Sequence, residues 1–160
     1  MAIEKVKRYL ENIGELDRLM IFEESTATVD LAAKAIGCEP GNIAKTISLL
    51  VEDNPILILL AGDVKIDNHK FKDTFHTRPK MIPAEKVEEY VGHAVGGTCP
   101  FEVNEGVPIY LDESLKRFKT VYPAAGNEHS CVRLKLEELE KFINSAGWVD
   151  VSKNSNLNKN

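Results

Sequence analysis

Two neighbouring runs of mostly apolar residues constrain the fold more than any other feature of this chain. Residues 43–51 and 56–61 are rich in Ile, Leu and Ala, and the segment Asp53-Asn54-Pro55 separates them. Short apolar runs bounded by a turn predict two strands joined as a hairpin. Because the apolar residues do not alternate strictly with polar ones, we expect both faces of the hairpin to be covered by helices.

The rest of the chain supplies such helices and further strands. Residues 3–12 have helical spacing, with Ile3, Val6, Leu10 and Ile13 on one side. Thr28 and Gly37 are a suitable N-cap and C-terminal residue for a helix over 29–36. Further helices are expected over 66–75, 83–90, 113–117 and 136–145, and further strands over 19–22, 107–111, 120–122, 131–134 and 148–151. The expected fold class is mixed α/β (α+β), with a mainly antiparallel sheet and helices packed around it.

A single domain is expected over residues 1–151. The chain of 160 residues is long enough to bury a core without disulfides or metal. Its N-terminus lacks the apolar stretch of a signal peptide, and its longest apolar run, 55–61, is too short to span a bilayer. Residues 152–160 are polar and low in complexity, which predicts a disordered tail.

Cysteine usage and charge narrow the class of function. The cysteines Cys38, Cys99 and Cys131 are widely spaced and form no zinc-binding pattern, as expected of a reduced, cytoplasmic protein without metal. The net charge of −5 argues against binding nucleic acid, DNA included, through bulk electrostatics, and leaves open only a weak or partner-assisted nucleic-acid contact. No membrane role is implied. Residues 65–80 nevertheless hold five Lys or Arg against two Asp, a surplus that either contacts phosphates or forms a solvated surface.

A glycine-rich loop is the clearest candidate for contacting a ligand. Within residues 92–101, Gly96 and Gly97 are followed by Thr98, Cys99 and Pro100. Adjacent glycines expose backbone N–H groups with no Cβ in the way, and Pro100 fixes the direction in which the chain leaves. Such a loop can receive a carbonyl or hydroxyl on its main chain, although an ordinary turn has the same composition.

Two charged residues are candidates for contacting the same ligand. Lys45 falls near the start of the first apolar run, where burial disfavours its charge and a nearby carboxylate would restore it. A fixed ammonium there can polarise a carbonyl or hold a phosphate, whereas a strand-edge lysine would reach solvent. Asp112 ends the strand 107–111, where it can cap the next helix and still face a pocket with its other carboxylate oxygen.

A cysteine nucleophile is the alternative chemistry. Cys99 together with His93 or His129 could form a thiol–imidazole pair. No helix begins directly after Cys99 to lower its pKa, and Pro100 follows it. A packed or pocket-lining thiol is therefore the favoured interpretation.

Five segments together resemble the successive blocks of the YbaK/prolyl-tRNA editing domain family. They are Ala32-Ala33-Lys34-Ala35-Ile36-Gly37, Ile43-Ala44-Lys45-Thr46, residues 92–101, Tyr110-Leu111-Asp112-Glu113-Ser114 and Tyr122-Pro123-Ala124-Ala125-Gly126. Their order and spacing agree over residues 20–150. The resemblance implies a mixed, barrel-like sheet surrounded by helices, in a free-standing member of the family.

The same resemblance implies an activity and a set of site residues. The activity is that of a trans-acting deacylase, which hydrolyses the ester of a mischarged tRNA, such as tRNA(Pro) carrying Cys or another small amino acid. No metal or cofactor is implied, and the implied partners are the tRNA acceptor end and prolyl-tRNA synthetase. Lys45, Gly96 and Gly97 would carry catalysis. The residues implied to contact the substrate are Thr46, His93, Thr98, Cys99, Pro100, Asp112 and Gly126. Glu102 departs from the glycine common at its position.

The chemistry of such an enzyme is simple, and two other functions use the same residues. An aminoacyl ester is already activated, so positioning and oxyanion stabilisation supply most of what hydrolysis needs. The nucleophile would be a bound water or, for a cysteinyl substrate, the substrate's own thiol. The alternatives are a non-catalytic module that holds an aminoacyl or nucleotide end for a synthetase, and a Cys99-dependent hydrolase of unrelated esters.

Overall fold

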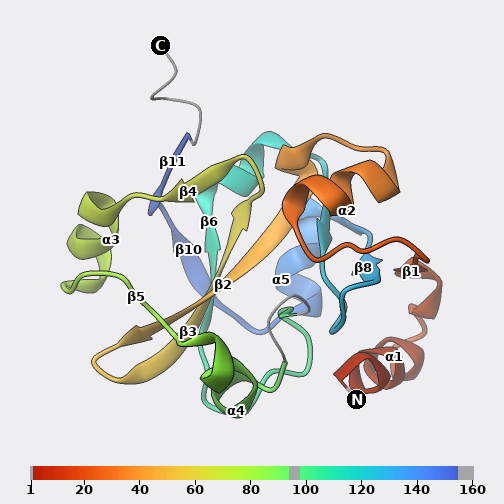
Figure 1. Ribbon diagram of the computed structural model, residues 1–160, viewed down its shortest axis with the longest axis horizontal. Coiled ribbons are helices and arrows are strands. Elements are labelled where there is room, and N and C mark those ends of the chain that lie inside the picture. The colour runs from red at the N-terminus through yellow and green to blue at the C-terminus, as the bar shows by residue number, and fades with distance from the viewer. Residues whose placement is uncertain (1, 94–97, 155–160) are drawn as a thin grey trace.

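The computed structural model describes residues 2–93 and 98–154, and its elements surround one long central hairpin (Figure 1). The α-helices are α1 (Ala2–Asn12), α2 (Val29–Ile36), α3 (Asn68–Phe75), α4 (Val87–Val91) and α5 (Leu139–Phe142). The strands are β1 (Leu19–Ile21), β2 (Ile43–Val51), β3 (Asn54–Ala61), β4 (Val64–Ile66), β5 (Lys80–Met81), β6 (Ile109–Asp112), β7 (Thr120–Pro123), β8 (Ser130–Val132), β9 (Leu134–Lys135), β10 (Ser145–Val149) and β11 (Ser152–Asn154). Single 3₁₀ turns lie at Leu16–Arg18, Pro40–Asn42, Ala84–Lys86, Glu113–Arg117 and Leu136–Glu138.

The predicted hairpin is confirmed, but its turn lies earlier than expected. Strands β2 and β3 pair antiparallel from Ala44↔Ala61 to Val51↔Asn54. The loop is formed by Glu52 and Asp53, which both have positive φ, at 51° and 69°. Positive φ at both positions matches the right-handed twist of a two-residue hairpin. The expected turn at residues 53–55 is therefore wrong, because Asn54 and Pro55 already belong to the paired strand.

The hairpin is the centre of a seven-stranded sheet whose strand order is β10-β6-β3-β2-β7-β9, with β5 also paired to β2. The pairs β10–β6, β6–β3 and β2–β7 are parallel, whereas β3–β2, β2–β5 and β7–β9 are antiparallel. The sheet is curled into a half-barrel, as the mixed α/β class with a barrel-like sheet implied. Five of the eight strand pairs among the described residues are antiparallel, which confirms the expected mainly antiparallel arrangement, while β6 runs parallel to β3 and β7 parallel to β2.

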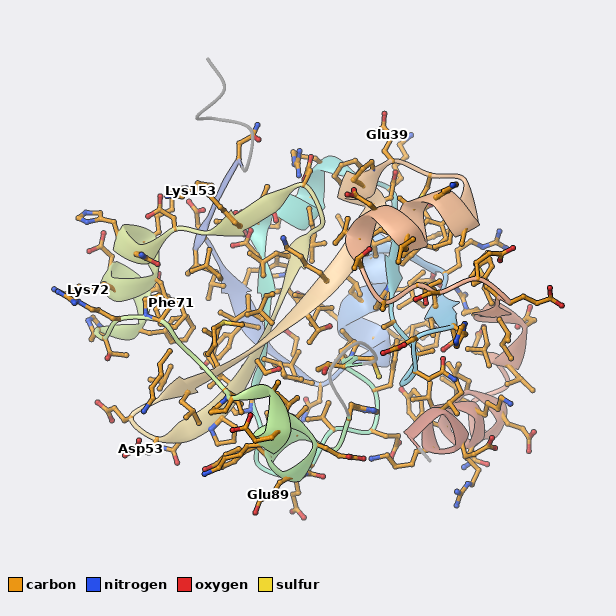
Figure 2. All side chains as sticks on the ribbon, in the orientation of Figure 1. Glu39, Asp53, Phe71, Lys72, Glu89 and Lys153 are labelled. Atoms are coloured by element: carbon orange, nitrogen blue, oxygen red, sulfur yellow. The ribbon has the colours of Figure 1, made fainter. Side chains whose placement is uncertain are left out.

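Helices cover the sheet as the hairpin's apolar character predicted. Residues Leu57 to Leu60 of β3 are fully buried, so both faces of this strand are covered. From α1, Val6 and Leu10 reach the core, and from α3 Phe71 does (labelled in Figure 2). Ile13, which was expected on the buried side of α1, is 43% exposed because the helix ends at Asn12.

The C-terminal region departs most from expectation. The helix expected over 136–145 is a 3₁₀ turn followed by the four-residue α5, because Ile143 adopts an extended conformation. The chain then runs as β10 parallel to β6. The disordered tail expected from residue 152 is corrected for its first three residues, since Ser152–Asn154 form β11 against β4. Within the described part of the chain, none of the helices has the length and hydropathy that crossing a bilayer requires.

Candidate functional site

A cavity of about 310 Å³ lies against β2, between the start of α2 and the segment that joins β5 to α4. Small apolar side chains and hydroxyl groups form much of its wall. The lining residues that matter here are Thr26, Thr28, Ala32, Ala44, Lys45, Thr46, Met81, Ile82, Thr98, Tyr122 and Cys131. The backbone N–H of Ile82 donates to the Ser48 carbonyl, which holds the β5 side of the cavity against β2 (3.2 Å). The volume is at the lower end of the range for small-molecule sites.

Lys45 is the charged group of the cavity wall, and its stem is half-buried. Its Nζ donates a hydrogen bond to the carbonyl oxygen of Val64, at the start of β4. Burial lowers the pKa of Lys45, and the Asp63 carboxylate partly offsets this effect. Asp63 is itself paired with Arg117 at 2.5 Å, and the pKa of Asp63 is lowered mainly by that hydrogen bond. The ammonium is therefore oriented by a carbonyl and lies in the field of a carboxylate that Arg117 already binds.

Two of the four threonines in the cavity wall, Thr46 and Thr98, were predicted from the sequence. Thr46 follows Lys45 on β2, and its Oγ1 is buried with no hydrogen-bond partner among the described residues. A buried hydroxyl left unpaired costs free energy, so a polar ligand atom that reached it would regain that cost. Thr98, the first described residue after the glycine pair, also lines the cavity. Lys45, Thr46 and Thr98 are thus the predicted residues that the structure brings together.

The glycine-rich loop is held at its base by the N-terminal helix. Lys5 Nζ donates to the carbonyl oxygens of Gly92 (3.1 Å) and Glu102 (3.3 Å), one on each side of the loop. The Asn104 N–H donates to the Val91 carbonyl at 2.9 Å and closes the same base. Gly96 and Gly97, the predicted oxyanion donors, lie outside the described residues.

His93 and Cys99 lie together in the core, and neither is among the described residues that line the cavity. His93 Nε2 is 2.6 Å from the Phe101 carbonyl oxygen and 3.4 Å from Cys99 Sγ, and both residues are fully buried. Burial lowers the pKa of His93 and raises the pKa of Cys99 to about 12. The pair is thus a neutral imidazole beside a neutral thiol, which is the packed thiol favoured from sequence. Pro100 is also buried and is not among the lining residues.

Cys99 is therefore expected to be dispensable for chemistry. Because its thiol stays protonated near neutral pH, native protein should resist alkylation at Cys99, and the half-buried Cys38 should be modified first. Cys99→Ala should keep ester hydrolysis within about threefold of wild type, measured on folded protein below its unfolding temperature. A loss of about 100-fold in folded Cys99→Ala, with Cys38→Ala as the unaffected control, would instead make Cys99 the nucleophile.

Asp112 takes the capping role and has no carboxylate oxygen left for the cavity. Oδ2 accepts from the Ser114 N–H at 2.9 Å and from Ser152 Oγ at 2.6 Å, while Oδ1 accepts from the Val151 N–H at 2.8 Å. The side chain is fully buried and is not among the described lining residues. The expectation that its second oxygen faces the pocket is corrected, because that oxygen accepts from the N–H of Val151, in the connection between β10 and β11. Gly126 has a φ of 103° in the turn after β7 and likewise lies outside the lining.

Several residues of the site carried no clear signal in the sequence. The carbonyl of Val64 and the Asp63 carboxylate reach Lys45 only because the turn after β3 begins where Ala61 pairs with Ala44 of β2. Lys5 reaches the loop from 87 positions away in the chain. Tyr122 and Ala124, by contrast, could have been identified, since both belong to a segment that resembled the family. The described residues hold no group of three or more His, Cys, Asp or Glu side chains that could bind a metal.

Fold and cavity together define a small α/β domain with a lysine-bearing pocket, and the comparisons give its family. The sequence pattern of the aminoacyl-tRNA editing domain matches residues 23–142. The chain belongs to this family. It is 42% identical over 154 residues to the uncharacterised protein YwhH of Bacillus subtilis (strain 168), covering 96% of this chain and 98% of that protein. The resemblance seen in the sequence is thereby confirmed.

Proteins connected with proline charging share the domain. The structure of a proposed trans-editing enzyme for prolyl tRNA synthetase superposes with a TM-score of 0.84 at 28% identity, covering 95% of this chain and 97% of that one. The proline–tRNA ligase of Aquifex aeolicus (strain VF5) is 28% identical over 99 residues, which are 61% of this chain but 17% of the ligase. This chain therefore matches only a small part of that ligase.

Proposed function

We propose that this protein is a trans-acting aminoacyl-tRNA deacylase that hydrolyses the ester of tRNA(Pro) carrying Cys or another small amino acid. The observation that carries the proposal is the oriented, half-buried Lys45 ammonium in the wall of a small cavity. A full-length match to a proposed trans-editing enzyme for prolyl tRNA synthetase supports the same assignment. The proposed partners are the acceptor end of the mischarged tRNA and, through it, prolyl-tRNA synthetase.

Each group has a defined part in the proposed reaction. Lys45 holds the ester or the adjacent phosphate, and Thr46, the next residue of the cavity wall, contacts the aminoacyl group. The backbone N–H groups of Gly96 and Gly97 stabilise the oxyanion that forms when water attacks the carbonyl carbon. The ester C–O bond then breaks, and the ribose oxygen takes up a proton as the free amino acid leaves. For a cysteinyl ester, the substrate's own thiol can attack the carbonyl carbon instead of water. The ester C–O bond then breaks, the ribose oxygen takes up the thiol proton, and water later opens the released cyclic thioester to give free cysteine.

The cavity's size predicts which esters are accepted. Small alanine side chains and the β2 backbone leave room for a small aminoacyl group, so bulky ones should be excluded sterically. We expect hydrolysis of Cys-, Ala- or Ser-tRNA(Pro) well above the uncatalysed rate and little acceleration for Phe-tRNA(Pro). Discrimination between side chains that differ by one methylene should be only about 10- to 200-fold. Tight binding of all these tRNAs without hydrolysis of any would favour the non-catalytic binding module.

A further inference from the structure

A group of cations lies beside the cavity, on the segment that joins two of its walls. This segment begins at Val64, whose carbonyl accepts from Lys45 of the cavity wall, and it reaches the cavity wall itself at Met81 and Ile82. Between these points it forms β4, α3 and β5, which lie on one side of the molecule with β11 beside β4 (Figure 1). We call the cations of this region the basic face; they are Lys65, Lys70, Lys72, Arg78, Lys80 and Lys153.

The basic face has a local excess of positive charge, whereas the chain as a whole is negatively charged. Residues 65–80 carry five Lys or Arg and two Asp, whereas the whole chain has a net charge of −5. Figure 2 shows Lys72 and Lys153 on the α3 side, while the acidic Glu39 and Glu89 lie at other parts of the outline. An anionic ligand approaching the cavity would therefore be drawn toward this side.

Two lysines of the basic face occupy directly opposed positions. In the antiparallel pair β11–β4, Lys153 is paired with Lys65. Like charges directly opposite on neighbouring strands are destabilising. Asp67 offsets part of this repulsion: its pKa is lowered first by the Lys70 backbone N–H and further by the Lys153 charge.

The ion pairs of the region leave most of its cations available. Lys70 is committed, because its Nζ donates to Asp150 at 3.1 Å and to the Ser152 carbonyl at 2.8 Å. Within residues 2–93 and 98–154, no ion pair is formed by Lys65, Lys72, Arg78 or Lys80, and all four are exposed. By contrast, Arg18, Lys116 and Arg117 each pair with a carboxylate elsewhere on the surface.

We propose that the basic face binds the phosphate backbone of the tRNA acceptor arm while the aminoacyl end occupies the cavity. This inference rests on the proposed function. Lys65, Lys72 and Lys153 would contact phosphates of the backbone without reading bases, since RNA helices are recognised mainly through shape and backbone. A few such contacts suit a protein of net negative charge, which would bind tRNA weakly and release it after hydrolysis.

The test compares two triple variants that remove the same charge. One is Lys65→Gln/Lys72→Gln/Lys153→Gln on the basic face. The matched control is Arg8→Gln/Lys119→Gln/Lys141→Gln, three exposed residues on other elements. Each is assayed with charged full-length tRNA(Pro) and with the same amino acid on adenosine alone, over about 50–200 mM salt.

The basic-face variant should lose about tenfold or more in kcat/KM on full-length tRNA, with the salt dependence of log(kcat/KM) shallower by about 2. It should retain wild-type rates on aminoacyl-adenosine, and the control variant should retain both. Equal losses in the two variants, or none in either, would overturn the proposal. If the wild type hydrolyses no ester, the proposed function fails. In that case, equilibrium binding of uncharged tRNA(Pro) to the same variants tests separately whether the basic face binds tRNA.

Discussion

Replacing Lys45 with alanine is expected to lower single-turnover ester hydrolysis by about 100-fold or more while the protein remains folded. Lys45 is the charged group of the cavity wall, and its ammonium is oriented by the Val64 carbonyl. Partial burial strengthens the interaction of this charge with an ester or a phosphate, because the effective dielectric constant is lower than in water. No described neighbour could take its place in the cavity wall, since Arg117 is already paired with Asp63.

Two further variants separate the charge from the packing of the side chain. Lys45→Met keeps most of the apolar stem and removes the ammonium, so it should lose as much activity as Lys45→Ala. Lys34→Ala, an exposed lysine on α2, should retain wild-type activity. Near-wild-type activity in folded Lys45→Met would show that the stem, rather than the charge, is what the reaction requires.

Because the pKa of Lys45 is lowered, the hydrolysis rate should depend on pH in a definite direction. Burial disfavours the ammonium, so Lys45 releases its proton at lower pH than an exposed lysine does. Hydrolysis that depends on the ammonium should be fully present below this pKa and decline as the pH rises through it. The decline should be visible after subtracting spontaneous ester hydrolysis, and should be missing from Lys45→Met.

The second large effect concerns stability: Asp112→Ala should lower the free energy of unfolding by about 3 kcal/mol or more. Its carboxylate accepts three hydrogen bonds, from the N–H groups of Ser114 and Val151 and from Ser152 Oγ. Removing it leaves two backbone donors and a hydroxyl without their partner, and it loosens the connection from β10 to β11. Urea unfolding monitored by Trp148 fluorescence measures the change.

A neighbouring carboxylate provides the control for Asp112. Glu113→Ala removes an exposed residue whose only ion pair among the described residues is with Lys116, across one helical turn, so it should change stability by about 0.5 kcal/mol or less. Asp112→Ala, assayed well below its unfolding temperature, should hydrolyse ester at close to the wild-type rate. If Asp112→Ala were stably folded but inactive, Asp112 would have a role in the reaction itself.

Local sequence patterns predicted much of this fold because they depend on neighbours in the chain. Thr28 accepts the Leu31 N–H, and Gly37 ends α2 with a left-handed φ of 85°, as capping preferences predict. The apolar hairpin and the first helix follow from spacing alone. The boundaries that failed depend on distant partners: Ser152–Asn154 form a strand only because β4 offers them an edge, and Ile143 leaves the helix to bring β10 beside β6.

The site was predictable to the extent that the family's blocks were recognisable. Lys45, Thr46 and Thr98 line the cavity, as the resemblance implied. His93 and Cys99 belong to the same sequence block as Thr98, and Asp112 belongs to the next block, but all three are buried in the core. The spacing of residues in a block does not show which side chains face the cavity and which face the core. The Lys5 contacts with the loop arise only from tertiary packing.

The most direct test of the account is single-turnover deacylation of Cys- and Ala-tRNA(Pro), with excess protein and with Pro-tRNA(Pro) as the cognate comparison. The assay measures the released amino acid and the regenerated tRNA 3′ end, which is detected by charging the tRNA again. Wild type and Lys45→Ala are assayed in parallel. The account predicts that wild type releases a small non-cognate amino acid faster than proline and that the tRNA it leaves can be recharged. With Lys45→Ala, neither amino acid release nor the amount of rechargeable tRNA should exceed background. The account would be contradicted if wild type bound the charged tRNAs but hydrolysed every ester only at the uncatalysed rate.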